Sequence, residues 1–229
     1  MHVAGKGGRV VVVVDRQMSR RLNVLVWDIP VRVFHWLLVI CFAGAWITSE
    51  SERLQLIHYA FGYCACLLVL IRVFWGLVGT RYARFTQFVK TPQAIGLHFM
   101  HILDAKDHSD LGHNPAGAYA MLGLMAFMLL IGITGYMGVK EYFGDWASEA
   151  HELLATLALC LVILHLVAAL VMSVIERENL VKAMLTGKKM GMPEQAIRYP
   201  HYVVGGLMLG AVAYFYYLVV SGSLPSLTT

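Results

Sequence analysis

The stretch HELLATLALCLVILH, residues 151–165, begins and ends with a histidine and carries one acidic residue, Glu152, between them. His151 and His165 are fourteen residues apart, which is close to four turns of an α-helix at about 3.6 residues per turn. The two rings therefore lie on one face of one helix, separated by about 21 Å of rise. An ionisable ring inside such an apolar helix is costly in lipid, so both histidines indicate a functional site at membrane depth.

The composition of the whole chain indicates that the bilayer is its solvent. Hydrophobic residues make up 59% of the 229 residues and charged residues 14%, whereas soluble domains have about half and about a quarter. A membrane-spanning helix needs about 20 mostly apolar residues. The segments that meet this requirement are about 31–49, 57–79, 115–138, 150–174 and 202–221. The sequence therefore predicts an all-α integral membrane protein.

Basic residues are concentrated in alternate connections between the expected spans. They are Lys6, Arg9, Arg16, Arg20, Arg21 and Arg32 before or at the first span, Arg81, Arg84, Lys90 and Lys106 between the second and third, and Arg177, Lys182, Lys188, Lys189 and Arg198 between the fourth and fifth. The other two connections hold only Arg53 and Lys140, among several acids. By the positive-inside rule the N-terminus is cytoplasmic and the C-terminus is periplasmic. Because the cations follow this topology, they do not indicate a nucleic-acid partner.

The N-terminal region does not resemble a cleavable signal peptide. Its apolar run, residues 10–14, is five residues long, shorter than the core of about 7–15 residues that a signal peptide needs. Translation from Met1 and translation from Met18 both remain open. We expect residues 1–23 to form a cytoplasmic extension. The five tryptophans, Trp27, Trp36, Trp46, Trp75 and Trp146, fall near expected span ends, as in the aromatic belts of membrane proteins.

Four of the ten histidines fall at membrane depth, and the orientation assigns a level to each. His58 and His151 lie toward the outer surface, and His35 and His165 lie toward the inner surface. Two imidazoles at one level are the axial set of a six-coordinate haem iron, so the sequence predicts two haems, one at each level. A single membrane histidine is more often an interhelical hydrogen-bond partner. Zinc is less favoured, because it usually takes three or more protein ligands. No CxxCH motif is present, which excludes covalent attachment of haem.

Several neighbouring residues fit a haem but have simpler explanations as well. Gly62 follows His58 by one turn and would let a flat ring approach the helix. Arg72, at the inner end of the second span, is expected to bind a haem propionate, although it could instead extend to lipid phosphates. His113 and Asn114 lie at the same level and either bind a propionate or cap the third span. The glycines of that span serve close helix packing or haem accommodation equally well.

These residues stand in motifs that resemble a known family. VWDIPVRVFHW at residues 26–36 is similar to the opening signature of bacterial di-haem cytochrome b subunits, the group of the nickel–iron hydrogenase cytochrome b subunits and the bacterial cytochrome b561-like proteins. The motifs that follow in the same order are HYAFGY at 58–63, RVFWGLVGTRYARF at 72–85, GHNPAGA at 112–118, TGYMG at 134–138 and HELLATLALCLVILH at 151–165. The resemblance covers about residues 24–175.

The resemblance implies a four-helix transmembrane haem-binding bundle with two non-covalent haem b groups, ligated by His35, His58, His151 and His165. It also implies electron exchange between a periplasmic redox partner and the quinone pool, in the inner membrane of a bacterium. The remaining expected regions are a cytoplasmic connection at 176–201, an extra transmembrane helix at 202–221 and a tail at 222–229. The extra helix is expected either to pack on the bundle or to contact a partner.

The identity of the outer partner stays open at this level. The connections between spans one and two and between spans three and four are short. This favours a small soluble c-type cytochrome or another dehydrogenase over a large hydrogenase. A stand-alone enzyme that oxidises superoxide and reduces quinone is an alternative, but the outer connections offer few cations for an anionic substrate. A membrane anchor with purely structural haems is a third possibility.

Overall fold

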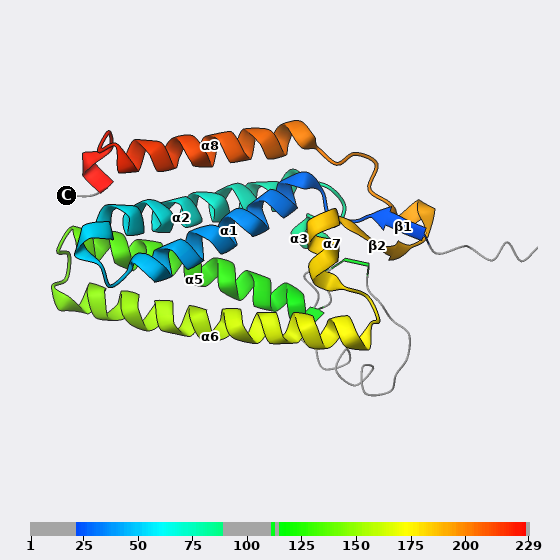
Figure 1. Ribbon diagram of the computed structural model, residues 1–229, viewed down its shortest axis with the longest axis horizontal. Helices are drawn as coiled ribbons and strands as arrows, with labels where there is room; N and C mark the ends of the chain where they lie inside the picture. The colour runs from blue at the N-terminus through cyan, green and yellow to red at the C-terminus, as the bar shows by residue number, and fades with distance from the viewer. Residues whose placement is uncertain (1–21, 89–110, 113–114, 228–229) are drawn as a thin grey trace, which may run out of the picture.

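Five long helices form one bundle in the computed structural model, which describes residues 22–88, 111–112 and 115–227 (Figure 1). They are α1 (Ile29–Thr48), α2 (Gln55–Val78), α5 (Pro115–Val139), α6 (Asp145–Ile175) and α8 (Tyr202–Val220). Each is long and apolar enough to cross a membrane, which confirms the five predicted spans. The largest difference is at α6, which begins at Asp145 rather than near residue 150. Its first five residues include Asp145, Ser148 and Glu149 and so give no hydropathy signal.

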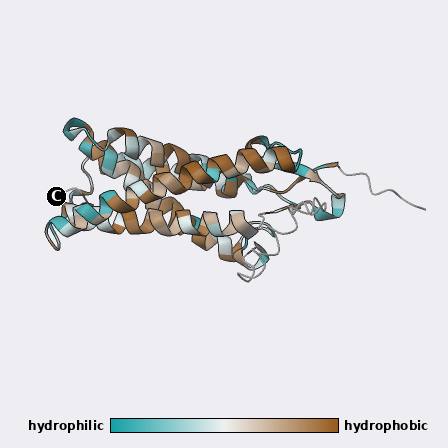
Figure 2. Ribbon diagram, turned by 90° about the horizontal axis from the view of Figure 1, so that it is seen from below, coloured by the Kyte–Doolittle hydropathy of each residue, from teal (hydrophilic) through white to brown (hydrophobic). Residues whose placement is uncertain are grey.

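The surface of the bundle is apolar around its middle. Leu70 on α2, Leu164 on α6 and Leu207 on α8 are each more than half exposed. Hydrophobic residues cover the central part of the helices and hydrophilic residues gather toward the ends (Figure 2). Such a surface is stable only against lipid, because large apolar patches are rare on soluble monomers.

The two ends of the bundle differ and are named here by their structure. The hairpin end holds the short α1–α2 and α5–α6 connections, residues 49–54 and 140–144, and the end of α8 (Figure 1). The first connection contains the short 3₁₀ helix η1 (Glu52–Leu54), and η3 (Pro225–Leu227) follows α8. The sheet end holds a two-stranded sheet and the short helices α3 (Phe85–Phe88) and α7 (Leu180–Thr186).

The long helices pack in an order that leaves α1 and α6 without extensive direct contact. α1 packs on α2, α2 on α5, and α5 on α6. α8 lies against α1 and α2, on the side away from α5 and α6 (Figure 1), so the extra helix packs on the bundle. α1 and α6 make no comparable contact, although both are described in full. In a four-helix bundle α1 and α6 would be neighbours. α1 carries His35, and α6 carries His151 and His165.

The sheet end contains structure that the hydropathy of the sequence did not predict. β1 (Leu22–Leu25) pairs antiparallel with β2 (Lys188–Gly191), so the segment before the first span is joined to the connection after the fourth. η2 (Pro193–Gln195) follows β2. Both strands have four residues, and β2 begins with two lysines, so neither gives a recognisable strand pattern.

Gly187 is the junction that fixes this small sheet against α1. It caps α7 with a φ of +79°, a conformation that glycine adopts without strain. Its carbonyl oxygen accepts hydrogen bonds from the backbone N–H groups of Val26 at 2.8 Å and Trp27 at 3.0 Å. A β-carbon at Gly187 would lie 2.6 Å from the Trp27 carbonyl oxygen. Residue 187 therefore has to be glycine, both because its φ is positive and because a β-carbon would overlap the Trp27 carbonyl oxygen.

Two tryptophans do not belong to a lipid-facing belt, contrary to the expectation from their positions in the sequence. Trp27 and Trp75 are 6% and 9% exposed and pack with Val24, Val26 and Val31 in a cluster at the sheet end. Trp46 and Trp146 are exposed, as predicted. Trp27 and Trp75 are buried because the sheet covers the ends of α1 and α2, which would otherwise lie at the membrane interface.

Candidate functional site

His58 of α2 and His151 of α6 face each other near the hairpin end. Their ring centroids are 6.1 Å apart and their planes are inclined by 72°. Metal–imidazole bonds are about 2.0–2.1 Å long. Two imidazoles that bind one metal from opposite sides therefore have centroids about 6 Å apart, because the ligating nitrogen of each ring adds about 1 Å. The spacing of His58 and His151 fits a single metal atom between the two rings.

Neighbouring helices fix the orientation of both rings. The Nδ1 atom of His58 lies 2.8 Å from the carbonyl oxygen of Ala45 on α1. The Nδ1 atom of His151 lies 2.9 Å from the carbonyl oxygen of Ile131 on α5. A carbonyl can only accept, so each Nδ1 carries the proton and donates it. The Nε2 atom of each ring is then unprotonated and is available as a ligand, as in many metal-bound histidines.

Two glycines leave space beside this pair of rings. A β-carbon at Gly135 on α5 would lie 3.0 Å from both Cε1 and Nδ1 of His151. A β-carbon at Gly62, one turn after His58, would meet nothing within 4 Å. By contrast, Gly132 serves helix packing, because a β-carbon there would overlap the Cys66 sulfur at 2.0 Å. On α5, Gly132 thus serves close helix packing, whereas Gly135 leaves space at the histidine pair.

His35 of α1 and His165 of α6 lie toward the sheet end. They are close enough for an electrostatic interaction between the two side chains, and both are partly buried. The Nδ1 atom of His35 is buried and has no hydrogen-bond partner among the described residues. Its ring contacts the edge of the Trp36 ring, with centroids 5.1 Å apart. The inner pair therefore places two side chains within electrostatic range of each other, and His35 has no backbone anchor like those of the outer pair among the described residues.

Arg72 is buried rather than extended to the membrane surface. It is 1% exposed, so the alternative of a side chain in contact with lipid phosphates is wrong. Its guanidinium lies over the rings of Phe85 at 5.1 Å and Phe34 at 6.0 Å. Nη2 donates to the carbonyl oxygen of Ala83 at 3.0 Å. Nε and Nη1 have no partner within the part of the chain that the structure describes, and such buried donors call for an acceptor.

Asp28, in the same motif as His35, organises the sheet end but gave no signal in the sequence. Its side chain is fully buried. Oδ1 accepts from the backbone N–H of Val31 at 2.9 Å and so caps α1. Oδ2 accepts from Trp75 Nε1 at 3.0 Å and from Thr80 Oγ1 at 2.7 Å. The carboxylate thereby connects the start of α1 to the end of α2, and this positions His35 relative to Arg72. His113 and Asn114 lie outside the described residues.

The site can hold a flat cofactor with a metal at its centre. The outer rings have the spacing of two axial ligands, their Nδ1 atoms are engaged, and Gly62 and Gly135 carry no side chain beside them. Near the inner pair, Arg72 has buried donors without acceptors, as an anionic group on the cofactor would require. Paired histidines inside an apolar helical bundle define the class of membrane-bound b-type cytochromes.

Comparison with known proteins identifies the family. Residues 26–187 match the family described as prokaryotic cytochrome b561, and the chain belongs to this family. It is thus a multi-pass membrane protein of the cytochrome b type, which binds haem b without a covalent link. No solved structure matches the chain closely enough to be informative.

Curated relatives carry one recurring name. The chain is 28% identical to a protein named probable Ni/Fe-hydrogenase 1 B-type cytochrome subunit in Escherichia coli K12, over 51% of this chain and 60% of the relative. Proteins named probable Ni/Fe-hydrogenase B-type cytochrome subunit are 22% identical in Rhizobium leguminosarum, over 74% and 90% of the two chains, and 23% identical in Rhodobacter capsulatus, over 75% and 83%. The chain therefore spans less than two thirds of the Escherichia coli relative.

Proposed function

We propose that this chain carries electrons across a bacterial inner membrane between a periplasmic redox protein and a quinone, using two haem b groups. His58 and His151 hold the outer haem, and His35 and His165 hold the inner haem. The observation that carries the proposal is the separation of 6.1 Å between the outer rings, together with the Nδ1 bonds that leave each Nε2 available. When bound, haem iron supplies a one-electron couple between its ferric and ferrous states.

The protein's own residues set the conditions for this transfer. Backbone carbonyls of Ala45 and Ile131 hold the outer rings in one tautomer and orientation. Arg72 offers Nε and Nη1 to a propionate of the inner haem, where burial strengthens a charge-assisted hydrogen bond. The apolar helices exclude water from both levels. With two histidines on each iron, a small molecule would exchange electrons with the haem without binding the metal.

The hairpin end is the proposed periplasmic face and the sheet end the proposed cytoplasmic face. This assignment rests on the charges: Glu50, Glu52, Glu141, Asp145, Glu149 and Glu152 at the hairpin end are exposed. At the sheet end, Arg81, Arg84, Lys182, Lys188 and Arg198 are exposed. The positive-inside rule places the second group in the cytoplasm. The acidic hairpin end also fits poorly with an anionic substrate such as superoxide.

Among the candidate periplasmic partners we now put a nickel–iron hydrogenase first, ahead of the c-type cytochrome that the short connections favoured, because the relatives are named as cytochrome subunits of such hydrogenases. The short connections of residues 49–54 and 140–144 leave the outer haem level close to the hairpin surface, where a partner's own redox centre can approach it. A c-type cytochrome or another dehydrogenase remains compatible with the same surface. Copurification of the chain from its native membrane, followed by reduction of its haems by the copurified protein, would identify the partner.

The experiment that tests the two-haem assignment uses the purified protein. Pyridine haemochrome analysis should give two b haems per chain, and a redox titration should show two steps. His151→Ala and His165→Ala should each remove mainly one step, and the steps should differ. His201→Ala is the matched control, because His201 contacts Trp75 at a ring distance of 5.4 Å and belongs to neither pair. A wild-type protein with one haem, or with none, would refute the proposal.

A further inference from the structure

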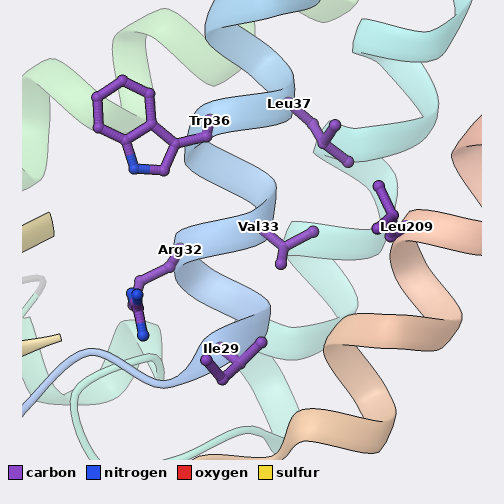
Figure 3. Close-up of a pocket in the computed structure, with 6 residues that line it drawn as sticks. All are labelled: Ile29, Arg32, Val33, Trp36, Leu37 and Leu209. Carbon is purple, nitrogen blue, oxygen red and sulfur yellow. The ribbon is translucent and has the colours of Figure 1, made fainter. Parts of the chain in front are cut away.

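An open pocket lies between α1 and α8 toward the sheet end (Figure 3). The residues that line it are Ile29, Arg32, Val33, Trp36, Leu37 and Leu209. Four of the six are aliphatic, and the apolar surface around the middle of the bundle places the pocket beside lipid. Val33 and Leu37 lie at the edge of this α1 face nearer Leu209 of α8, whereas Arg32 and Trp36 lie one above the other at its other edge (Figure 3).

The polar side of this pocket holds two hydrogen-bond donors that have no acceptor. Nε1 of Trp36 and Nε of Arg32 are buried atoms without a partner among residues 22–88, 111–112 and 115–227. The indole nitrogen lies on the edge of the Trp36 ring that faces Arg32 (Figure 3). Buried N–H groups are normally satisfied, and neither group can accept a hydrogen bond. Both donors therefore call for an acceptor.

The pocket also adjoins the inner histidine pair. Successive residues of an α-helix are rotated by about 100°, so Arg32 and Trp36 lie about 60° and 100° around α1 from His35, in the same direction. The Trp36 ring touches the His35 ring edge to face, with centroids 5.1 Å apart. An occupant that reaches these two donors therefore lies beside the inner haem level rather than at a remote surface.

We propose that this pocket binds the ring of a quinone, with a carbonyl oxygen accepting from Trp36 Nε1–H and Arg32 Nε–H and the isoprenoid tail lying along Val33, Leu37 and Leu209. The inference rests on the proposed function, which requires a quinone but does not locate it. In the reductive direction the quinone takes two electrons, one at a time, from the inner haem and two protons from cytoplasmic water, and becomes a quinol. Oxidation of a quinol releases the same two electrons and two protons.

The chemistry of the pocket favours a quinone over other membrane components. The two donors have no acidic residue beside them in the pocket lining, so they favour an acceptor on the ligand. The lining at Val33, Leu37 and Leu209 is apolar, as a hydrocarbon tail requires. Leu209 belongs to α8, which lies outside the residues matched to the family, 26–187. The extra helix thus supplies one wall of a site that the four-helix core alone would leave open.

Two substitutions test the location, each with a matched control on the same helix. Leu209→Trp fills the pocket, and Leu207→Trp places the same side chain at a residue that is 69% exposed. Trp36→Phe keeps a ring but removes the unpaired N–H, and Trp46→Phe makes the same change toward the hairpin end. Arg32 is left unchanged, because its Nη2 donates to the carbonyl oxygen of Leu185. Each purified variant is examined with decylubiquinol as reductant and with a photoreactive azidoquinone as label.

We expect Trp36→Phe to slow haem reduction by decylubiquinol about tenfold, the scale of one lost hydrogen bond. Leu209→Trp should slow it by about tenfold or more, because the indole fills the space of the quinone, while both controls keep the wild-type rate. The azidoquinone should label peptides of α1 or α8. If decylubiquinol reduces the wild-type haems but neither substitution matters and the label falls elsewhere, the location is refuted and the proposed function stands. If decylubiquinol fails to reduce the haems of the wild-type protein, the quinone step of the proposed function fails as well.

Discussion

The ring of His151 rests on Gly135, with only 3.0 Å between the ring atoms and the place where a β-carbon would lie. The same ring donates its Nδ1 proton to the carbonyl oxygen of Ile131, one turn earlier on α5. α5 contributes no histidine, yet it provides both the acceptor that turns the ring and the space that receives it. The outer haem level thus depends on four helices: α2 and α6 supply the histidines, and α1 and α5 supply the carbonyl acceptors.

The first prediction concerns Gly135→Val, which we expect to deplete the outer haem. The branched side chain would push the His151 ring away from Ile131 and from the axis it shares with His58. Overpacking costs about 1–3 kcal/mol, or roughly a 5- to 150-fold loss of affinity for the outer haem. The haem-to-protein ratio under limiting haem should fall toward one. Gly123→Ala is the control, because its β-carbon would lie 3.5 Å from Leu161; loss of both haems in Gly135→Val would instead indicate misfolding.

The second prediction uses Gly62, where the space for a β-carbon is empty. A β-carbon at Gly62 would meet nothing within 4 Å, and the same holds at Gly206 on α8. Gly62→Leu and Gly206→Leu should therefore leave the folding of the protein alone equally unaffected. Only Gly62→Leu should exclude a haem, because its side chain enters the space beside His58. Absorbance at the haem Soret band relative to protein measures the difference, and equal haem content in the two variants would contradict a haem at this position.

The sequence was a good guide to the parts of this molecule that depend on helix periodicity and hydropathy. The fourteen-residue spacing of His151 and His165 required one continuous helix, and α6 is continuous from Asp145 to Ile175. All five spans were recognised, because a lipid-facing helix is apolar nearly all round. The pairing of His58 with His151 followed from depth alone, and their rings are in contact distance.

Contacts between distant segments were not predictable in this way. The carbonyl acceptors of Ala45 and Ile131 belong to the backbone and leave no signature in the residue types. The pairing of β1 with β2 joins residues about 165 positions apart in strands too short to recognise. Asp28 gave no signal in the sequence, because its bonds to Trp75 and Thr80 depend on how α1 and α2 meet. The burial of Arg72 likewise follows from the packing of Phe34 and Phe85 around it.

The third prediction concerns the charge beside the inner haem. Arg72→Met removes a cation, and the ferric state carries one more positive charge than the ferrous state, so the midpoint potential of the inner haem should fall. A differential interaction of about 1 kcal/mol corresponds to about 40–50 mV for one electron. The outer haem should keep its potential in the same redox titration. Arg84→Met, at an exposed residue of the sheet end, is the control, and an unchanged pair of potentials in Arg72→Met would show that Arg72 is only structural.

The fourth prediction concerns the carboxylate that joins α1 to α2. Asp28→Ala removes the cap of α1, worth about 1 kcal/mol, and leaves Trp75 Nε1 and Thr80 Oγ1 without their acceptor in a buried place, which costs about 1–3 kcal/mol more. We expect the free energy of unfolding in detergent to fall by about 2–4 kcal/mol. Asn179→Ala, which removes only the cap of the short helix α7, should cost about 1 kcal/mol.

A second substitution separates the cap of α1 from the unpaired indole. Asp28→Ala combined with Trp75→Phe removes the stranded donor together with its acceptor, so the double variant should be less destabilised than the sum of the two single variants. The recovery should be about 1 kcal/mol or more. Simple addition of the two losses would mean that the Trp75–Asp28 hydrogen bond of 3.0 Å contributes nothing, and that the cap alone explains why Asp28 is buried. The recovery we expect would make this carboxylate the group that holds the start of α1, and with it His35, against the end of α2 that carries Arg72.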